Sequence, residues 1–393
     1  MEPWDFKESF LFSMAEYESR ASRVKQKMDE QGFDALIIHK PENTYYLTGH
    51  RGAAHDDYVC LIFPKEKEPL FVMSLLEVDC ARVLSTVKRI EPFSVFAPPP
   101  QNEPIPHLAR VLKTEGLDKG RIGIELDSWW FTPRMFQQLQ QELPRTKWTD
   151  CTFLIDSLRV FKSEAELNYM RAAGRILTRA MYAAINAVRE DGTENDVVRA
   201  LWKTLLAEGC DPQCNWINNP IVSSGYRTAL THNTWSNRRL RRGEPVFIEF
   251  AGVVKQYYAP MMRTVAVTEP SKEVKEIMDV VLEALECGIQ AVKPGVTSGE
   301  VDDAVRGTIR KRGWGDYFLH RTAYTVGIAF PPGWGSAPGI KEKDPTVLQP
   351  GMTFHMVPTL NRYHFGIGLS EPIAVTEKGC ELLAGVERKL FIK

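Results

Sequence analysis

Two segments in the second half of this chain repeat one pattern, and the repeat constrains the fold more than any single motif does. The segments are residues 187–209, AVREDGTENDVVRALWKTLLAEG, and 291–313, AVKPGVTSGEVDDAVRGTIRKRG. Each contains Ala-Val, a glycine, a capping Thr or Ser, a helical stretch and a closing glycine. A long helical pattern precedes each segment (163–190 and 271–292) and strands follow it. We therefore expect two α-α-β-β units related by a pseudo-twofold axis, with a cleft between their sheets.

Residues 1–155 show a different pattern, in which short apolar runs alternate with helical stretches. This alternation predicts a layered α/β domain, followed near 156–162 by the boundary to a second domain, residues 156–393. Local patterns in the first domain predict a charged helix that is stopped by a glycine, a turn, and a proline-rich surface loop. These lie at 16–31 with Gly32, at 41–43, and at 95–106.

The composition gives no reason to expect a nucleic-acid or membrane partner. The chain has 393 residues, of which 44% are hydrophobic and 25% charged, and its formal net charge is −1, as in an ordinary globular protein. The first twenty residues carry acidic side chains where a secretory signal has basic ones, and no apolar run approaches the length of a membrane span. Seven scattered cysteines indicate reduced thiols, so we expect a cytoplasmic protein.

The stretch 232–264, HNTWSNRRLRRGEPVFIEFAGVVKQYYAPMMRT, contains the strongest signal for a functional site. It predicts a polar loop with His232, a strand over 245–252, and a second strand that starts near Gln256. Because side chains alternate along a strand, Phe247 and Glu249 share one face. An ionised carboxylate within an apolar run is costly to bury unless it is paired or used. Glu249 therefore either faces water at a sheet edge or belongs to a site.

This stretch resembles the creatinase/prolidase/methionine aminopeptidase family, whose catalytic domain has the "pita-bread" fold. The resemblance continues through HRTAYTVGI (320–328), LQPGMTFHMVP (348–358) and GLSEPIAVTEKG (368–379). It implies a two-domain α/β protein with a creatinase-like N-terminal domain and a pita-bread catalytic domain. It also implies a homodimer in which the N-terminal domain of one subunit closes the site of its partner. The residues expected to reach the partner's pocket are Arg51, His55, Asp56 and Asp57.

The chain departs from the metal ligands of this family. Its metallopeptidases hold two metal ions with two Asp, one His and two Glu, and the corresponding residues here are Glu249, Pro260, Tyr324, Val357 and Ser370. Hard divalent ions need several converging oxygen or imidazole ligands, and proline and valine side chains supply none. We therefore expect no metal ion and no other cofactor, and a different chemistry on the same fold.

Polar side chains from both repeats are expected to meet in the cleft. His232 matches the histidine that creatinase uses for proton transfer, and with Glu249 and Glu371 it completes the expected catalytic set. The expected substrate-binding residues are Tyr324, His320, Arg321, Arg263, Trp235 and His355. The aromatic and imidazole groups of Tyr324, His320 and His355 could equally be hydrogen-bonded core residues.

The expected substrate is a small zwitterion. Two carboxylates without a metal ion would form an anionic pocket that favours a planar amidinium or guanidinium cation. Arg263, Arg321 or Arg238 could bind a substrate carboxylate. The runs FAGVVKQYYAPMMRT and GMTFHMVP look more similar to the ectoine hydrolase branch of the family than to creatinase, which has Glu at the position of Met262. The resemblance thus implies opening of the cyclic amidine of ectoine to N-acetyl-diaminobutyrate.

A hypothesis for the mechanism assigns one step to each group. His232 acts as general base and then as general acid, while Glu249 positions the attacking water or attacks the amidine carbon itself. Tyr324 or His320 donates a hydrogen bond to the tetrahedral intermediate. Three alternatives remain open: a creatinase-like amidinohydrolase, an Xaa-Pro metallopeptidase with a rearranged site, and a catalytically inactive binding protein of the same fold.

Overall fold

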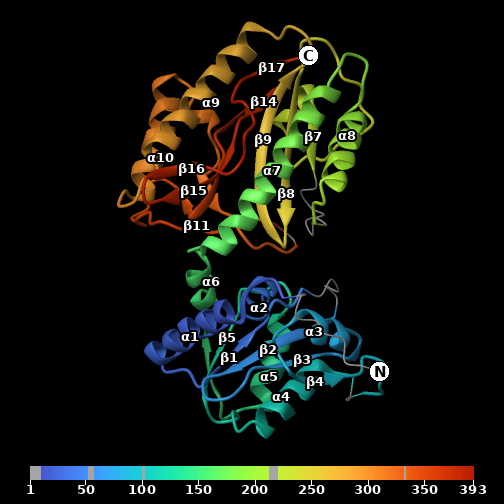
Figure 1. The fold of residues 1–393 in the computed structure, drawn as a ribbon, viewed down its shortest axis with the longest axis vertical. Coiled ribbons are helices and arrows are strands. Elements are labelled where there is room, and N and C mark those ends of the chain that lie inside the picture. Colours follow the sequence, from blue (N-terminus) through green and yellow to red (C-terminus); the bar gives the residue numbers. More distant parts are fainter. Residues whose placement is uncertain (1–9, 52–56, 100–101, 212–219, 332) are drawn as a thin grey trace. The chain divides into compact units, whose positions relative to one another are not determined.

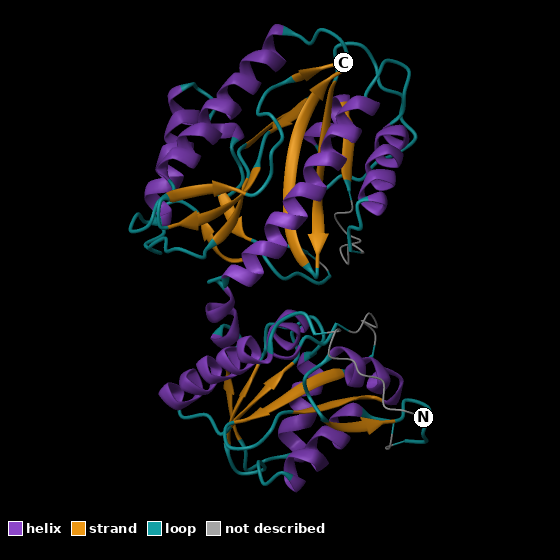
Figure 2. Cartoon of the chain, viewed as in Figure 1, coloured by secondary structure: helices purple, strands orange, loops and turns teal. Residues whose placement is uncertain are grey.

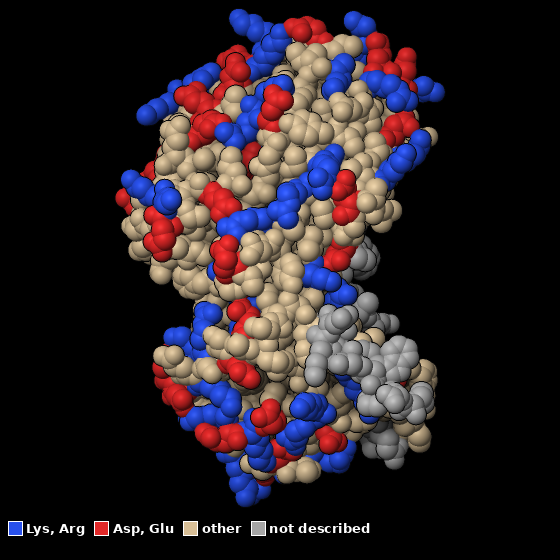
Figure 3. Space-filling model, viewed as in Figure 1, with Lys and Arg blue, Asp and Glu red and all other residues tan. Residues whose placement is uncertain are grey.

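The computed structural model describes residues 10–51, 57–99, 102–211, 220–331 and 333–393. Contacts within the chain divide it into two compact units, Met1–Arg159 and Val160–Lys393 (Figure 1). None of the helices in the described ranges combines the length and the apolar character that crossing a membrane requires. On the face drawn in Figure 3, basic and acidic side chains are interspersed over both units, in keeping with the near-zero net charge.

The first unit is a six-stranded mixed sheet with helices on both faces (Figure 2). The strand order is β4-β3-β2-β1-β5-β6, in which β1 runs antiparallel to β2 and parallel to β5. Its elements in chain order are α1 (Met14–Gln31), β1 (Ala35–Ile38), α2 (Pro41–Thr48), β2 (Val59–Pro64), β3 (Leu70–Ser74), η2 (Leu75–Glu77), α3 (Val78–Leu84), β4 (Arg89–Phe93), α4 (Pro104–Thr114), β5 (Arg121–Ile124), α5 (Pro133–Glu142), β6 (Lys147–Asp150) and α6 (Leu154–Arg159).

The expected turn at 41–43 is wrong, because these residues form the first turn of α2. Proline is well tolerated at the first helical position, since its missing N–H would have no partner there. The cap comes from far along the chain: the buried carboxylate of Glu125, just after β5, accepts the backbone N–H groups of His39 and Lys40 at 2.8 and 2.7 Å. The proline-rich loop also ends earlier than expected, because α4 begins at Pro104 for the same reason.

The second unit consists of two helix pairs that cover a four-stranded and a five-stranded sheet, with a small hairpin between them. The sheet orders are β17-β9-β8-β7 and β11-β10-β12-β15-β16, and β13 pairs with β14. Its elements are α7 (Glu164–Ala187), α8 (Glu194–Ala207), β7 (Ile221–Ser224), η3 (Gly225–Ala229), β8 (Pro245–Val254), β9 (Tyr257–Ala266), α9 (Lys272–Ala291), α10 (Ser298–Lys311), η4 (Gly315–Tyr317), β10 (Ala323–Thr325), β11 (Ser336–Ile340), β12 (Thr353–Met356), β13 (Thr359–Arg362), β14 (Phe365–Gly368), β15 (Glu371–Thr376), β16 (Gly379–Leu382) and β17 (Phe391–Ile392).

The structure contains the repeat that the sequence predicts. Helices α8 and α10 both begin with a reciprocal capping box, at Thr193 and Thr297, and both are followed by a glycine with positive φ, Gly209 and Gly313. Each helix pair packs on its own sheet, and each half has its own apolar core. The sequence signal was strong because caps and closing glycines are local features.

Helix α7 packs very closely against the central strand β8. A Cβ atom added to Gly252 of β8 would lie 2.1 Å from the carbonyl oxygen of Ala173 in α7. Ile248 and Phe250 point to the α7 side and are fully buried in the core. The opposite face of β8, which carries Phe247 and Glu249, is therefore left for the space between the two halves.

Candidate active site

A cavity of about 480 Å³ lies between the two halves of the second unit. The first half contributes β7, β8, β9 and the segment 228–232, and the second half contributes 319–324, 333–335, Val357 and β13. The wall is formed by Ile221, Ser223, Thr228, Leu230, Thr231, His232, Phe247, Glu249, Met262, Leu319, His320, Arg321, Tyr324, Gly333, Trp334, Gly335, Val357, Thr359 and Asn361. It is mostly apolar, with a few convergent polar groups, as in sites for small molecules.

Glu249 is a buried carboxylate in this wall, with 8% of the residue exposed. Its strand neighbours are Ile221 on β7 and Met262 on β9, which offer no charge. Within the described part of the chain, its side chain forms no hydrogen bond or ion pair. Burial raises the pKa of Glu249 to about 8, because an ionised carboxylate without a partner is poorly solvated there. The carboxylate is thus available to a ligand.

Two histidines face the same cavity. His232 lies in the loop between η3 and β8, with a positive φ of 59°. The Nδ1–H of His320 donates to the backbone carbonyl of Arg321 at 2.8 Å, because a carbonyl oxygen can only accept. Nε2 of His320 is then the nitrogen that can take up a proton. Partial desolvation lowers the pKa of His320, and nearby His232 lowers it further, so the imidazole is neutral at pH 7.

Arg321 is the cation of the wall. Its guanidinium lies 4.8 Å from the centre of the Tyr324 ring, in cation–π geometry. Among the described residues no carboxylate lies within 4.0 Å of it, so it forms no ion pair with Glu249. Partial desolvation lowers the pKa of Arg321. Among its described wall residues, the cavity therefore presents one carboxyl group and one guanidinium that are separate from each other.

A chain of hydrogen bonds runs from the cavity wall into the second sheet. The indole Nε1–H of Trp334 donates to the Tyr324 hydroxyl at 2.9 Å, and this hydroxyl lies 2.7 Å from Nδ1 of His355. Nε2 of His355 lies 2.6 Å from Oγ of Ser370, which accepts the backbone N–H of Met262 at 2.7 Å. His355 and Ser370 are fully buried and lie behind the wall, so His355 is not placed to touch a substrate.

The expected pairing of two carboxylates in the pocket is not found. Glu371 is fully buried outside the cavity wall, and its Oε1 accepts from Nη2 of Arg263 at 2.5 Å. The remaining N–H groups of Arg263 donate to the carbonyls of Met262, Ser370, Val386 and Glu387. An arginine with five such bonds has no donor left for a substrate. The Arg263–Glu371 pair joins β9 to β15 and is a structural element.

Other expected residues lie at different distances from the cavity. Trp235 is partly exposed and does not line the wall. Arg238 is occupied by Glu244, with contacts of 2.8 and 2.6 Å. In the first unit, Arg51 and Asp57 are described, whereas His55 and Asp56 lie outside the described residues.

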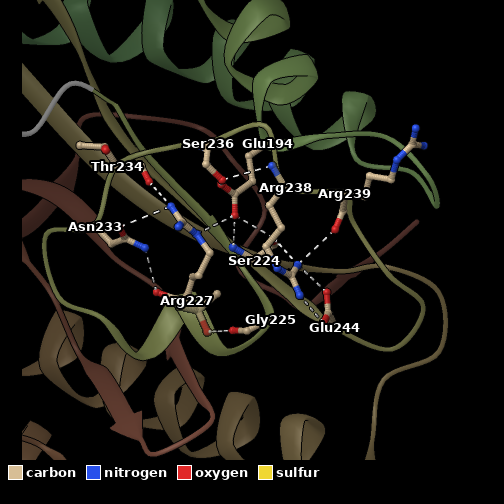
Figure 4. Close-up of polar contacts among 11 residues, drawn as sticks. Glu194, Ser224, Gly225, Arg227, Asn233, Thr234, Ser236, Arg238, Arg239 and Glu244 are labelled. Atoms are coloured by element: carbon tan, nitrogen blue, oxygen red, sulfur yellow. Dashed lines mark hydrogen bonds and ion pairs between the residues drawn. The ribbon is translucent and has the colours of Figure 1, made fainter.

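Glu194, the first residue of α8, anchors the loop that carries His232 (Figure 4). It is fully buried, and its two oxygens accept the backbone and hydroxyl donors of Ser224 and Ser236, at 2.7 to 2.8 Å. The guanidinium of Arg227 adds an ion pair at 3.3 Å. The loop leaves β7 at Ser224 and returns at Ser236, so Glu194 fixes both of its ends. A Glu at a helix start is common because it interacts favourably with the helix dipole, so its position does not indicate this second role.

Trp334 and Ser370 were also missed as members of the polar chain. Trp334 lies in the run PPGWGSAPG, where a tryptophan among prolines and glycines could have indicated a shaped loop beside a site. Ser370 could be identified from the sequence only as a replacement for a metal ligand, because its partners lie on two distant strands.

The described residues do not fit a two-metal centre. Of the five positions that correspond to metal ligands in the family, Glu249 and Tyr324 offer oxygen atoms to the cavity, and Val357 offers a methyl surface. Pro260 does not line the cavity, and Ser370 is engaged with His355. Over the ranges that the structure describes, no group of three or more His, Cys, Asp or Glu residues could hold a metal ion.

Comparisons with known proteins agree on the family. Residues 168–377 match metallopeptidase family M24, and residues 20–161 match the creatinase/prolidase N-terminal domain. The ectoine hydrolase of Halomonas elongata is 32% identical over 400 residues, covering 98% of this chain and 99% of that protein. The Xaa-Pro dipeptidase of Pyrococcus furiosus is 28% identical over 373 residues, covering 95% and 99%.

Solved structures extend the likeness to the whole fold. The prolidase from Pyrococcus horikoshii OT3 superposes with a TM-score of 0.82 at 26% identity, covering 95% of this chain and 99% of that one. The prolidase from Thermococcus sibiricus gives 0.86 at 25% identity, covering 97% and 100%. The expected two-domain architecture, with a creatinase-like domain before a pita-bread domain, is thus confirmed.

Proposed function

We propose a function for this chain from an established premise: it belongs to metallopeptidase family M24 and carries a creatinase/prolidase N-terminal domain. It is a hydrolase that acts on C–N bonds. Within that class, the proposed reaction is metal-independent hydrolysis of an amidine C–N bond in a small zwitterion. Ectoine, the molecule in the name of one relative, is the first candidate substrate.

The observation that carries the proposal is that the acid Glu249 and the cation Arg321 both line the cavity and are not paired with each other. The Glu249 carboxyl group is buried without a hydrogen-bond partner among the described residues, which disfavours its ionised form, and a ligand cation would stabilise that form. Arg321 has no carboxylate within 4.0 Å among those residues. A planar amidinium can pair with a carboxylate in bidentate fashion, and a guanidinium can do the same with a substrate carboxylate.

Of the three arginines that could bind a substrate carboxylate, Arg321 is the proposed anchor. Glu371 and backbone carbonyls occupy the donors of Arg263, and Glu244 pairs with Arg238. Arg321 remains, and it lies on the cavity wall. A ligand that bridges from Glu249 to Arg321 therefore needs an amidinium at one end and a carboxylate at the other.

In the proposed mechanism, Glu249 binds the amidinium and either positions a water molecule or attacks the amidine carbon itself. His232 accepts the proton from water, and Nε2 of His320 is a second acceptor in the same space. The water oxygen becomes bonded to the amidine carbon, one C–N bond breaks, and the protons pass to the leaving nitrogen. For ectoine, the ring opens and the product is N-acetyl-diaminobutyrate.

Metal independence is part of the proposal and rests on the donor set. A hydrolytic metal centre needs several ligands that converge on one point. The cavity wall has Glu249, His232 and His320 as potential ligands, and they do not form such a group. No step of the proposed reaction uses a metal ion.

The quaternary structure is a further part of the proposal. Leu319 and Leu230 lie on the cavity wall with 79% and 53% of each residue exposed, which leaves apolar surface for another element to cover. A homodimer in which the partner's N-terminal domain closes the cavity would cover it, as the family resemblance implies. Light scattering after gel filtration tests this point. A cytoplasmic location is proposed as well.

The test is a hydrolysis assay of the purified full-length protein with ectoine, hydroxyectoine, creatine and Xaa-Pro dipeptides, with and without EDTA. Mass spectrometry of the products should show an N-acyl diamino acid from ectoine, with no effect of the chelator. His232→Ala and Glu249→Gln should each lower turnover by at least about a hundredfold. The control Glu377→Gln, an exposed carboxylate at the β15–β16 turn, should be unaffected.

Other outcomes would replace the proposal. Cleavage of dipeptides that EDTA abolishes would identify a metallopeptidase, and release of urea from creatine would identify an amidinohydrolase. Tight ligand binding without turnover of any substrate would indicate a binding protein.

A further inference from the structure

We infer that His355 and Ser370 are positioning residues, which hold the hydroxyl of Tyr324 as a hydrogen-bond donor directed into the cavity. This inference deepens the proposed function and rests on it for the role of Tyr324 in turnover. The hydrogen-bond direction itself follows from the structure alone.

Two N–H groups fix the ends of the chain. The backbone N–H of Met262 donates to Oγ of Ser370 at 2.7 Å, and the indole N–H of Trp334 donates to the hydroxyl of Tyr324 at 2.9 Å. Neither group can accept a hydrogen bond. Each hydroxyl therefore has one lone pair occupied and still has its own proton to place.

His355 links the two hydroxyls. Its Nδ1 lies 2.7 Å from the Tyr324 oxygen, and its Nε2 lies 2.6 Å from the Ser370 oxygen. The imidazole is fully buried, and burial holds the pKa of His355 well below its usual range. A neutral imidazole has one donor and one acceptor nitrogen, so only two arrangements of protons are possible.

The first arrangement has the proton of His355 on Nε2. Tyr324 then donates to Nδ1, and Ser370 accepts from both Nε2 and the Met262 N–H. The proton of Ser370 is left in a fully buried place, and no further acceptor for it occurs among the described residues. Leaving a buried donor without a partner is costly.

The second arrangement has the proton on Nδ1. Ser370 then donates to Nε2, His355 donates to the Tyr324 oxygen, and that oxygen accepts from both His355 and Trp334. Within this chain of hydrogen bonds, the only proton then without an acceptor among the described residues is that of Tyr324, and this residue lines the cavity. A ligand or water molecule there can accept it, so this arrangement leaves no donor unpaired.

The consequence for the proposed reaction is a fixed donor beside the reacting carbon. Burial raises the pKa of Tyr324, so the phenol keeps its proton at neutral pH. It can stabilise the substrate atom that gains electron density during attack. Because its direction is set in advance, no reorientation is needed when the substrate binds.

The first test measures the tautomer directly in the unmodified full-length protein. Nitrogen-15 NMR of protein labelled at histidine distinguishes protonated from unprotonated ring nitrogens, and His355→Gln identifies the signal of His355. We expect protonated Nδ1 and unprotonated Nε2 at pH 7. A protonated Nε2 would overturn the inference. This test needs no substrate, so it stands even if the proposed function fails.

The second test is a double-mutant cycle with the substrate that the hydrolysis assay identifies. Tyr324→Phe should lower kcat about ten- to a hundredfold and change KM by less than about threefold. Ser370→Ala should lower kcat in the wild-type background but by less than about twofold in the Tyr324→Phe background, because it acts through the same hydroxyl. The matched control is Thr353→Val on β12, which removes another buried hydroxyl, bonded to the carbonyl of Val326.

Equal effects of Ser370→Ala in both backgrounds would overturn the positioning role, and so would a control that behaves like Ser370→Ala. If the wild-type protein hydrolyses none of the assayed substrates while the NMR shows protonated Nδ1, the proposed function fails and the hydrogen-bond direction stands.

Discussion

Glu249 offers the most direct test of the proposed ligand, because its charge state must change when a cation binds. Burial raises the pKa of Glu249 to about 8, so most of these carboxyl groups are protonated at neutral pH before a ligand enters. An amidinium pairs with the ionised form, and the amidinium itself stays charged over this range. Below pH 8, ligand binding should therefore release a proton from Glu249.

The size of the expected pH dependence of ligand affinity follows from the pKa of Glu249. About one site in ten is ionised at pH 7 and about one in a hundred at pH 6. Because the apparent affinity scales with the ionised fraction of Glu249, Kd should fall about tenfold between pH 6 and 7, about fivefold between pH 7 and 8, and then level off. Each tenfold step corresponds to about 1.4 kcal/mol of binding free energy. Glu249 is an acid with a raised pKa, so affinity must increase as the pH rises.

The assay is isothermal titration calorimetry with ectoine at several pH values, in buffers with different heats of ionisation. At pH 7 we expect about 0.9 protons released per site. Other groups in the cavity can also exchange protons on binding, and the Glu249→Gln variant measures their share. That variant should bind more weakly and lose the slope, whereas Glu377→Gln, which changes an exposed carboxylate, should keep it.

Three results would refute the reasoning. A wild-type Kd that does not change between pH 6 and 8 would show that no group with this pKa is linked to binding. An equal slope in Glu249→Gln would assign the linkage to another residue, and proton uptake would contradict the sign. If ectoine does not bind, acetamidinium tests the cation half of the argument with the same readout.

Four further predictions concern the site and its frame. Arg321→Gln should raise KM about ten- to a hundredfold with little change in kcat, because a charged hydrogen bond of about 1.5–3 kcal/mol is lost. A substrate analogue without the carboxylate should bind the variant and the wild type equally. Unequal binding of this analogue would count against Arg321 as the partner of the substrate carboxylate. Glu194→Gln should lower the unfolding free energy by about 1–3 kcal/mol in urea titrations, and it should also lower kcat, because the new amide N–H₂ faces hydrogen-bond donors of the loop that carries His232. An unchanged kcat would show that this loop does not need Glu194 as its anchor. Gly252→Ala should lower the unfolding free energy by about 1–3 kcal/mol or more, because the added Cβ would lie 2.1 Å from the carbonyl oxygen of Ala173, and a thermal melt at unchanged Tm would contradict the close packing. Glu249→Gln should be more stable than the wild type, and the difference in unfolding free energy should grow by on the order of 3 kcal/mol between pH 5 and 8. The reason is that an acid whose pKa is raised to about 8 on folding destabilises the folded state as the pH rises towards that value. Parallel pH profiles of denaturant unfolding for the two proteins would exclude this.

The features that could be predicted from the sequence are those with a short-range cause. The capping boxes at Ser163 and Thr193 and the αL glycine that ends α1 depend on residues within a few positions. The alternation that places Glu249 opposite Ile248 is equally local, and the structure has Ile248 in the core and Glu249 on the cavity wall. Repetition of local signals is also what revealed the two halves.

The features that could not be predicted depend on partners far along the chain. Helix α2 is capped by Glu125, which lies 85 residues beyond Lys40, so the local pattern indicated only a turn. Glu371 appeared to be free because its partner, Arg263, lies 108 residues away. A sequence shows which groups carry charge, but the pairing of those charges is decided by the strand order.

In this protein, a chain of hydrogen bonds lies where the family resemblance places metal ligands. Tyr324 and Ser370 occupy two positions that the family resemblance assigns to ligands, and both are now joined through His355. A metal centre stabilises negative charge with cations. The site of this protein instead offers a neutral donor, the Tyr324 hydroxyl, beside the carboxyl group of Glu249. Such a site favours a substrate that brings its own positive charge, as an amidinium does, over a neutral peptide bond that needs an external Lewis acid. Restoring ligands one at a time should therefore weaken amidinium hydrolysis before it creates any peptidase activity.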